Sequence, residues 1–131
     1  MVAAAAGNDA STTPAYPAAD REPGVLAIAV SIGADTLADF SNRGSWIDLA
    51  APGVGILSSV PIDQYGAWSG TSMAMPLAAG AAALVRAANP NLSPAEVAAR
   101  MTATAAHIRG AVPRRLDAAA ALGLSVRDGA S

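Results

Sequence analysis

The segment from Thr71 to Asn89 constrains the fold more than any other part of the sequence. Its apolar residues recur with the period of an α-helix, and Asn89 followed by Pro90 ends the pattern. This helix is apolar almost all round, which is typical of a helix buried inside a protein. A fold built on it therefore needs other elements to cover more than one of its sides.

Six short apolar runs predict β-strands. They lie at residues 2–6, 25–30, 38–43, 46–50, 56–60 and 65–68, and the third of them is expected to lead into a turn. The first has the small-residue pattern of a buried parallel strand, and the last two are spaced to pair as a hairpin. Residues 93–96 carry the capping-box spacing Ser-Pro-Ala-Glu, so we expect a second helix that runs to about Ala105. A last short helix is expected over residues 114–122, and a flexible tail over residues 123–131.

Length and composition exclude several classes of protein. With 131 residues the chain is the size of one domain, and hydrophobic residues at 53% argue against disorder. A net charge of −2 without a basic run argues against nucleic acid as a partner. Cysteine is absent, which excludes disulfides and thiolate metal sites. We expect no apolar stretch to reach the roughly 18 to 20 residues of a membrane span, and therefore no membrane partner.

Ser72 lies where a helix N-terminus can support chemistry. Its backbone N–H falls in the first helical turn, where N–H groups lack partners within the helix and negative charge is favoured. Gly70 permits a tight turn and a close approach of substrate to the backbone. Asn8, at the end of the strand at residues 2–6, would bring a neutral N–H donor. A serine nucleophile needs a base, and its tetrahedral intermediate needs such donors. Taken singly, Ser72 is read as a helix cap and Asn8 as a turn residue.

Several separated motifs resemble those of the subtilisin-like serine peptidases. They are Ala5-Ala6-Gly7-Asn8-Asp9, Tyr16-Pro17-Ala18, Phe40-Ser41-Asn42-Arg43-Gly44-Ser45, Ala51-Pro52-Gly53, Gly70-Thr71-Ser72-Met73-Ala74-Met75-Pro76 and Ser93-Pro94-Ala95-Glu96-Val97. Their order and spacing also match, over residues 2–122. The resemblance implies a partial subtilisin-like α/β fold, with a mostly parallel sheet flanked by helices and its N-terminal strands missing. Residues 1–122 would be the C-terminal half of the catalytic domain.

The resemblance implies a catalytic site around Ser72. Ser72 would be the nucleophile that forms the acyl-enzyme, and Asn8 with the Ser72 N–H would form the oxyanion hole. Five residues would shape the site for a polypeptide substrate: Ala5, Ala6, Gly7, Ala15 and Gly70. The resemblance also implies a cis peptide bond between Tyr16 and Pro17.

The family's catalytic aspartate and histidine belong to segments that precede the oxyanion asparagine. The chain is therefore expected to be half of a serine-type endopeptidase, inactive alone, with the N-terminal half of the domain as its partner. No cofactor is required for this catalysis. Family members often carry structural calcium and Asp48 matches a position near such a site, so calcium stays open. The resemblance alone favours an extracellular or cell-envelope location.

Two alternative interpretations differ from this one. His107 and Asp117 would serve Ser72 if the motif were that of an α/β-hydrolase, but such a motif requires glycine at Ala74 and an acid that precedes the histidine. We therefore expect His107 to be a surface or capping residue. The other alternative is a non-catalytic relic of a subtilase, which binds peptides or proteins through an exposed strand edge.

Two residues depart from the family's serine motif. Leu77 stands where histidine is common, and Met75 stands where a small residue is usual. We expect Leu77 to pack into the core and Met75 to narrow the space near Ser72.

Overall fold

A mostly parallel sheet forms the centre of the fold. The computed structural model describes residues 1–33, 35–109 and 114–124. Its strands are β1 (Val2–Ala5), β2 (Val25–Ile32), β3 (Thr36–Leu37), β4 (Leu49–Pro52) and β7 (Arg114–Arg115). β1, β2, β4 and β7 lie side by side in that order and are parallel, while β3 pairs antiparallel with β2.

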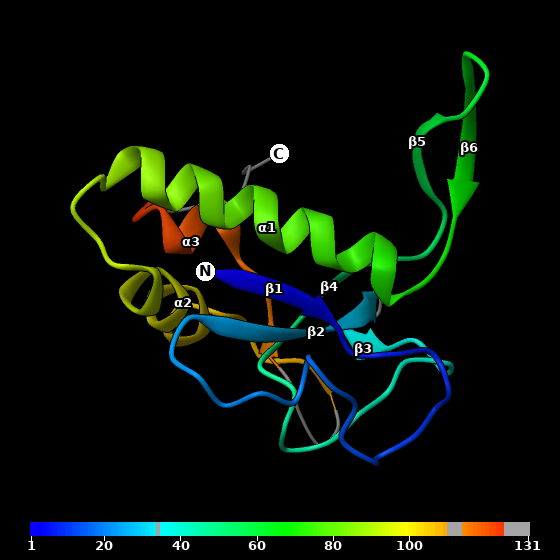
Figure 1. Ribbon diagram of the computed structural model, residues 1–131, viewed down its shortest axis with the longest axis horizontal. Helices are drawn as coiled ribbons and strands as arrows, with labels where there is room; N and C mark the ends of the chain where they lie inside the picture. Colours follow the sequence, from blue (N-terminus) through cyan, green and yellow to red (C-terminus); the bar gives the residue numbers. More distant parts are fainter. Residues whose placement is uncertain (34, 110–113, 125–131) are drawn as a thin grey trace, which may run out of the picture.

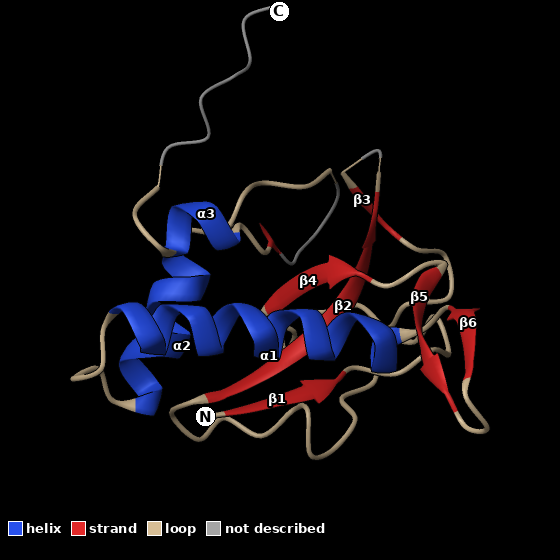
Figure 2. Cartoon of the chain, turned by 90° about the horizontal axis from the view of Figure 1, so that it is seen from above, coloured by secondary structure: helices blue, strands red, loops and turns tan. Residues whose placement is uncertain are grey.

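Three helices and a hairpin complete the described fold. The helices are α1 (Thr71–Ala88), α2 (Pro94–Ala103) and α3 (Ala118–Ala121), and the hairpin joins β5 (Ile56–Val60) to β6 (Gln64–Trp68). α1 crosses one face of the sheet, with α2 and α3 toward its C-terminal end (Figure 1, Figure 2). The hairpin stands beyond the N-terminal end of α1 (Figure 1). The predicted α/β fold is confirmed.

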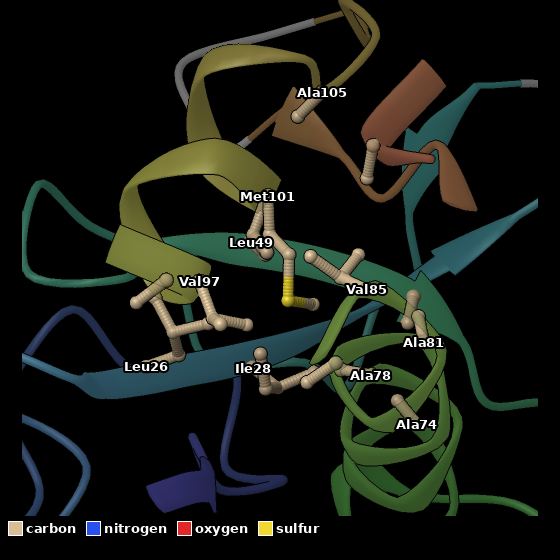
Figure 3. Packing of buried hydrophobic residues seen from close by; sticks show 14 of the residues in the cluster. Leu26, Ile28, Leu49, Ala74, Ala78, Ala81, Val85, Val97, Met101 and Ala105 are labelled. Atoms are coloured by element: carbon tan, nitrogen blue, oxygen red, sulfur yellow. The ribbon is translucent and has the colours of Figure 1, made fainter. Parts of the chain in front are cut away.

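The alternation of side chains along β2 separates two cores. Leu26, Ile28 and Val30 face the helices, whereas Ala27 and Ala29 face the loops on the other side of the sheet. On the helix side they meet Val85 of α1 and residues of α2 (Figure 3). On the loop side, the small side chains of β2 leave room for Trp46 and Ile47, which lie in the loop that precedes β4. Each face of β2 is thereby covered.

Small side chains let α1 approach the sheet closely. Its buried face is formed by Thr71, Ala74, Ala78, Ala81, Ala82 and Val85. Alanine has little side-chain entropy to lose and leaves space for the larger residues of the strands. Met101 of α2, which is fully buried, fills the space between the two layers (Figure 3).

The outer face of α1 is exposed, contrary to two expectations. Leu77 is 42% exposed and Leu84 is 55% exposed, so Leu77 does not pack into the core. An apolar pattern with helical period predicts a helix, but it does not show which face of that helix other elements cover. α1 is also long and apolar enough to cross a membrane, with a mean hydropathy of 1.2. The expectation that no stretch meets this test is wrong, although core helices of soluble proteins also meet it.

Two predicted strands differ from the structure. Residues 38–43 form turns, because the side chains of Ser41 and Asn42 occupy backbone groups that a strand would pair. The strand expected at residues 46–50 begins only at Leu49. One position earlier, the carboxylate of Asp48 accepts the N–H of Ala27 at 2.7 Å and takes the place of a strand carbonyl.

The C-terminal part of the described chain also departs from prediction. Residues 114–122 form β7 and the four-residue helix α3 instead of a single helix. The change occurs because Leu116 donates its N–H to Ala50 of β4, which draws this segment to the sheet edge. α2 ends at Ala103, two residues before the predicted end. Most of the predicted tail lies outside the described residues.

Candidate functional site

Ser72 lies in the first turn of α1, and its side chain is exposed. The turn is entered through Gly70, which has φ 155° and is buried. The Gly70 N–H donates to the carbonyl of Gly53 at 2.8 Å, so the start of α1 is fixed to the segment that follows β4. A Cβ atom at Gly70 would lie 3.4 Å from Nδ2 of Asn8. The predicted neighbours Ser72, Gly70 and Asn8 are therefore brought together.

The carboxamide of Asn8 is oriented by Thr71. Its Oδ1 accepts from the Thr71 backbone N–H at 2.9 Å and from the Thr71 hydroxyl at 3.0 Å. A backbone N–H can only donate, so this contact distinguishes the oxygen of the amide from its nitrogen. The Nδ2 group of Asn8 is left to donate elsewhere. This Nδ2 group lies near Gly70, at the start of α1.

The backbone N–H of Ser72 is a second donor in the same place. The N–H groups of the first helical turn have no partner within the helix. Of those at the start of α1, Thr71 donates to Asn8 and Met73 donates to the carbonyl of Gly70. The N–H of Ser72 stands between them and has no acceptor among the described residues. An oxygen that gained negative charge near Ser72 would find this N–H and the Asn8 amide.

Asn42 holds the turn that carries Asn8. It is 2% exposed, and its Oδ1 accepts from the N–H groups of Asp9 and Ser11 at 3.0 Å each. Its Nδ2 donates to the carbonyl of Ala6 at 2.9 Å. Gly7 has φ 106°, and a Cβ atom there would collide with Nδ2 of Asn42. Only glycine fits this turn at position 7.

Sequence reasoning missed Thr71 and Asn42 as parts of the site. Thr71 also accepts the N–H of Gly7 at its hydroxyl, at 3.1 Å, so it joins both residues of the turn to α1. Both residues stand in motifs that carried the family resemblance, but their partners lie more than thirty positions away. The sequence Asn42-Arg43-Gly44 predicts only a turn, and a turn prediction does not identify distant hydrogen-bond partners.

The residues expected to bind substrate occupy the end of β1 and the loop after it. Ala6 is 0% exposed, so its methyl group belongs to the core on the loop side of the sheet. Ala15 is half-buried and packs against that same core, while Ala5 and Gly7 are also half-buried. The peptide bond between Tyr16 and Pro17 is cis, as predicted.

Ser72 also lines an apolar groove of about 350 Å³ that does not include the turn of Asn8. It runs between the first turns of α1 and the hairpin, and its lining includes Leu57, Val60, Trp68, Ser72, Met73 and Leu77. Trp68 is 56% exposed and Leu57 is 70% exposed. Met75, expected to narrow this space, packs instead against the core on the helix side.

His107 and Asp117 do not serve Ser72 by any described contact. His107 is exposed, in the segment that follows α2. Asp117 is the N-cap of α3, where its Oδ1 accepts the N–H of Ala120 at 2.9 Å. Within residues 1–33, 35–109 and 114–124, no side chain forms a hydrogen bond with the Ser72 hydroxyl. The hydroxyl thus has donors near it but no base in contact.

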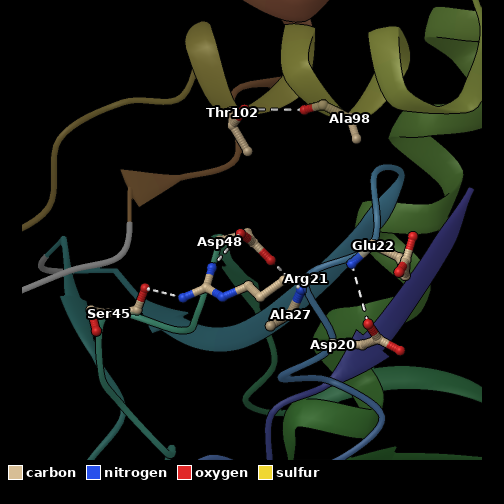
Figure 4. Close-up of polar contacts among 8 residues, drawn as sticks. All are labelled: Asp20, Arg21, Glu22, Ala27, Ser45, Asp48, Ala98 and Thr102. Carbon is tan, nitrogen blue, oxygen red and sulfur yellow. Dashed lines mark hydrogen bonds and ion pairs between the residues drawn. The ribbon is translucent and has the colours of Figure 1, made fainter.

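Asp48, the position matched to calcium binding, contacts the Ala27 N–H and the Arg21 guanidinium through its carboxylate (Figure 4). Burial raises the pKa of its carboxyl, while the Ala27 N–H and the Arg21 guanidinium act in the opposite direction. A calcium ion takes six to eight oxygen ligands. The described residues contain no group of three acidic, histidine or cysteine side chains able to hold a metal ion. Asp48 therefore does not belong to such a group of side chains within the described residues.

Known proteins with similar sequence and structure are serine proteases. The Subtilase family matches residues 1–129. A subtilisin of Bacillus pumilus is 44% identical over 112 residues, which cover 82% of this chain and 40% of that protein. The halolysin-like extracellular serine protease Nep of Natrialba magadii is 45% identical over 82% of this chain and 20% of its own length. A solved protease structure from Pseudoalteromonas arctica PAMC 21717 has a TM-score of 0.81 and 34% identity, over 91% of this chain and 41% of the other.

These alignments join the geometry of the site to one family. The chain spans less than half the length of each of these relatives. Within that span the family match and the fold of the solved protease agree. The chain belongs to the subtilase family of serine peptidases.

Proposed function

We propose that the chain carries the nucleophile and the oxyanion hole of a subtilisin-like serine endopeptidase. The observation that supports this most strongly is the orientation of Asn8. Because Thr71 holds the amide oxygen through two hydrogen bonds, Nδ2 is left to donate elsewhere near Gly70, at the start of α1, where the Ser72 N–H also has no acceptor among the described residues. Two neutral donors next to a serine are suited to stabilise the oxyanion of acyl transfer.

The proposed reaction is hydrolysis of a peptide bond through an acyl-enzyme. The Ser72 oxygen attacks the scissile carbonyl carbon, and the carbonyl oxygen takes up negative charge between Asn8 Nδ2 and the Ser72 N–H. When the tetrahedral intermediate collapses, the amine leaves with a proton and the acyl group stays on Ser72. Water then releases the acid by the same steps. A general base near the hydroxyl takes the Ser72 proton and, once protonated, gives it to the leaving amine; in the second half of the reaction it takes a proton from water and returns it to Ser72.

The base is proposed to come from residues outside this chain. The chain corresponds to less than half of its relatives, and the described residues place no base against Ser72. We propose that it is the C-terminal half of the catalytic domain and that the other half supplies the aspartate and histidine. Two surfaces that other described residues leave uncovered could receive that half: the edge of β1 that faces away from β2 and the outer face of α1. Alone, the chain is expected to be nearly inactive.

The proposed substrate is an extended polypeptide outside the cell or in its envelope. Backbone groups of residues 5–7, together with Ala15 and Gly70, would shape the site. Ala6 contributes its backbone there, since its methyl group is buried. The extracellular location is supported by one relative whose name states it, the protease Nep.

A fluorophosphonate probe that labels activated serines tests this proposal. The readout is intact mass, with Ser72→Ala as the control. The isolated chain is expected to label very slowly, and the whole protease that contains it is expected to label stoichiometrically at Ser72. Stoichiometric labelling of the isolated chain, lost in Ser72→Ala, would show that a base is present within it.

A second function is favoured by the edge position of β1. Among the described strands, β1 has a neighbour only on the β2 side, so its other edge is able to accept an extended peptide. In this case the chain is a non-catalytic peptide-binding relic. Fluorescence anisotropy with labelled extended peptides distinguishes the two functions. Binding that is unchanged in Asn8→Ala, together with no labelling of the whole protein, would favour the relic.

A further inference from the structure

Asp48 connects β2 to the segment that enters β4. Its backbone N–H donates to the carbonyl of Ala27 at 3.1 Å, and its Oδ2 accepts the Ala27 N–H at 2.7 Å. The side chain is 25% exposed, so this carboxylate has lost much of its hydration. A partly buried carboxylate that is ionised needs a nearby positive charge. Oδ2 is satisfied by the backbone, whereas Oδ1 points away from β2 toward the loop that precedes it (Figure 4).

Arg21 supplies a positive charge at that position. Its Nη1 lies 4.0 Å from Oδ1 of Asp48, and its Nη2 donates to the carbonyl of Ser45 at 3.1 Å. The guanidinium therefore contacts two points of the segment that leads into β4. Figure 4 shows the Arg21 side chain extending from the loop before β2 toward Asp48 and Ser45. A planar fork of donors is suited to holding two oxygen acceptors at once.

Neighbouring carboxylates do not turn this place into a metal site. Oδ1 of Asp20 accepts the N–H of Glu22 at 3.2 Å, which engages it in its own turn. Asp48 offers one oxygen, and the guanidinium already faces that oxygen. The carbonyl of Ser45 is also used by Arg21. A cation bound here would have to displace Arg21 from both of its contacts.

We propose that Arg21 is a positioning residue that acts as a built-in cation for Asp48, so that this part of the fold does not depend on calcium. Its second role is to attach the loop of residues 15–21 to the entrance of β4. That loop contains Ala15, Ala18 and Ala19, which pack on the loop side of the sheet. The inference depends only on these contacts and not on the proposed protease activity.

The effect of Arg21 on stability is expected to be small and dependent on salt. Its side chain is 63% exposed, and exposed ion pairs contribute little because water and salt screen them. Removing it opens no core, so a variant is expected to fold. For a chain of this size, we expect a loss of about 1 to 4 °C in Tm at low salt.

The experiment is a double-mutant cycle on the full chain, read by Tm in millimolar CaCl₂ and in excess EGTA. Arg21→Met keeps the aliphatic stem, Arg21→Lys keeps the charge, and Asp48→Asn keeps an acceptor for Ala27. Arg86→Met, an exposed arginine of α1 without a carboxylate partner among the described residues, is the matched control. Arg21→Met is expected to lower Tm, Arg21→Lys to restore part of the loss, and Arg86→Met to change little.

Two results would overturn the inference. One is an equal loss from Arg21→Met in the wild type and in the Asp48→Asn background, which would show that Arg21 does not act through Asp48. The other is a rise of several degrees in wild-type Tm with CaCl₂ that Asp48→Asn abolishes, which would show that Asp48 binds the metal. The expected result is loss of the Arg21→Met effect in the Asp48→Asn background, and no calcium shift that depends on Asp48.

Discussion

The two sides of Ser72 are built very differently. On one side, Asn8 and Gly7 are joined to Thr71 by three hydrogen bonds, and Asn42 holds the same turn from behind. On the other side, the groove under the hairpin is apolar and exposed, and described hydrogen bonds do not tie the Ser72 hydroxyl to it. The groups suited to stabilise charge are thus fixed within the described residues, whereas the base that we propose would have to approach from the other side.

The oxyanion side is expected to carry the largest effect on activity. In the whole protease, Asn8→Ala should lower kcat by about 100- to 1,000-fold with little change in KM, the loss known for the oxyanion asparagine of subtilisin itself and borrowed here. Steady-state kinetics on a peptide substrate measure this, with the exposed Asn91→Ala as the control. An unchanged kcat would remove Asn8 from the hole.

Asn42 should show that this side depends on buried polar support. Asn42→Ala removes a carboxamide from a residue that is 2% exposed. The Ala6 carbonyl and the N–H groups of Asp9 and Ser11 then lose their hydrogen bonds to this side chain. We expect a loss of about 3 kcal/mol in the free energy of unfolding. Urea denaturation measures it. A loss no larger than that of Asn91→Ala would mean that the turn is held by other contacts.

The two faces of α1 extend the comparison along the helix. Val85 is fully buried and its neighbour Leu84 is 55% exposed. Val85→Ala is expected to cost about 2 kcal/mol in the free energy of unfolding of the isolated chain, and Leu84→Ala to cost less than about 0.5 kcal/mol. Equal losses would indicate that the outer face of α1 is covered in solution, for example by a second copy of the chain.

A region remote from both sides provides the smallest effect. Hydrogen bonds with the Ser93 side chain and backbone lower the pKa of Glu96 from its ordinary value of 4.5. A lowered folded-state pKa means that this carboxylate stabilises the fold above pH 4.5 and loses that contribution as the pH falls through the folded value. Glu96→Gln should therefore make the urea midpoint slightly less dependent on pH in this range, without any effect on labelling of Ser72. The same pH dependence in the variant would show that Glu96 does not cause it.

The elements that could be predicted from sequence are those whose signal is local. The capping box at Ser93 and Glu96 is present in the structure, and so are the helix from Thr71 and the hairpin around residues 61–63. Strand predictions were wrong at residues 38–43, because polar side chains there bond to backbone groups far along the chain. A local apolar pattern does not contain that information.

The candidate site follows the same division. Ser72, Gly70 and Asn8 could be placed near one another from their motifs, whereas the role of Thr71 could not. Thr71 contacts Gly7 and Asn8, which precede it by 64 and 63 positions, and only the docking of β1 against α1 brings them together. Leu77 was misplaced for a related reason, since its exposure depends on what covers α1 and not on the helix itself.

The two hydrogen bonds between Asn8 and Thr71 make the pairing of Asn8 Nδ2 with the Ser72 N–H dependent on tertiary packing. Ser72 acquires its place in a helical turn as soon as α1 forms, but the Asn8 amide reaches it only after chain segments 63 residues apart have docked. A collapsed state that keeps its helices but has loose packing would therefore display the serine without its charge-stabilising partner. Formation of the donor pair would then require the docking of β1 against α1 and not the helix alone.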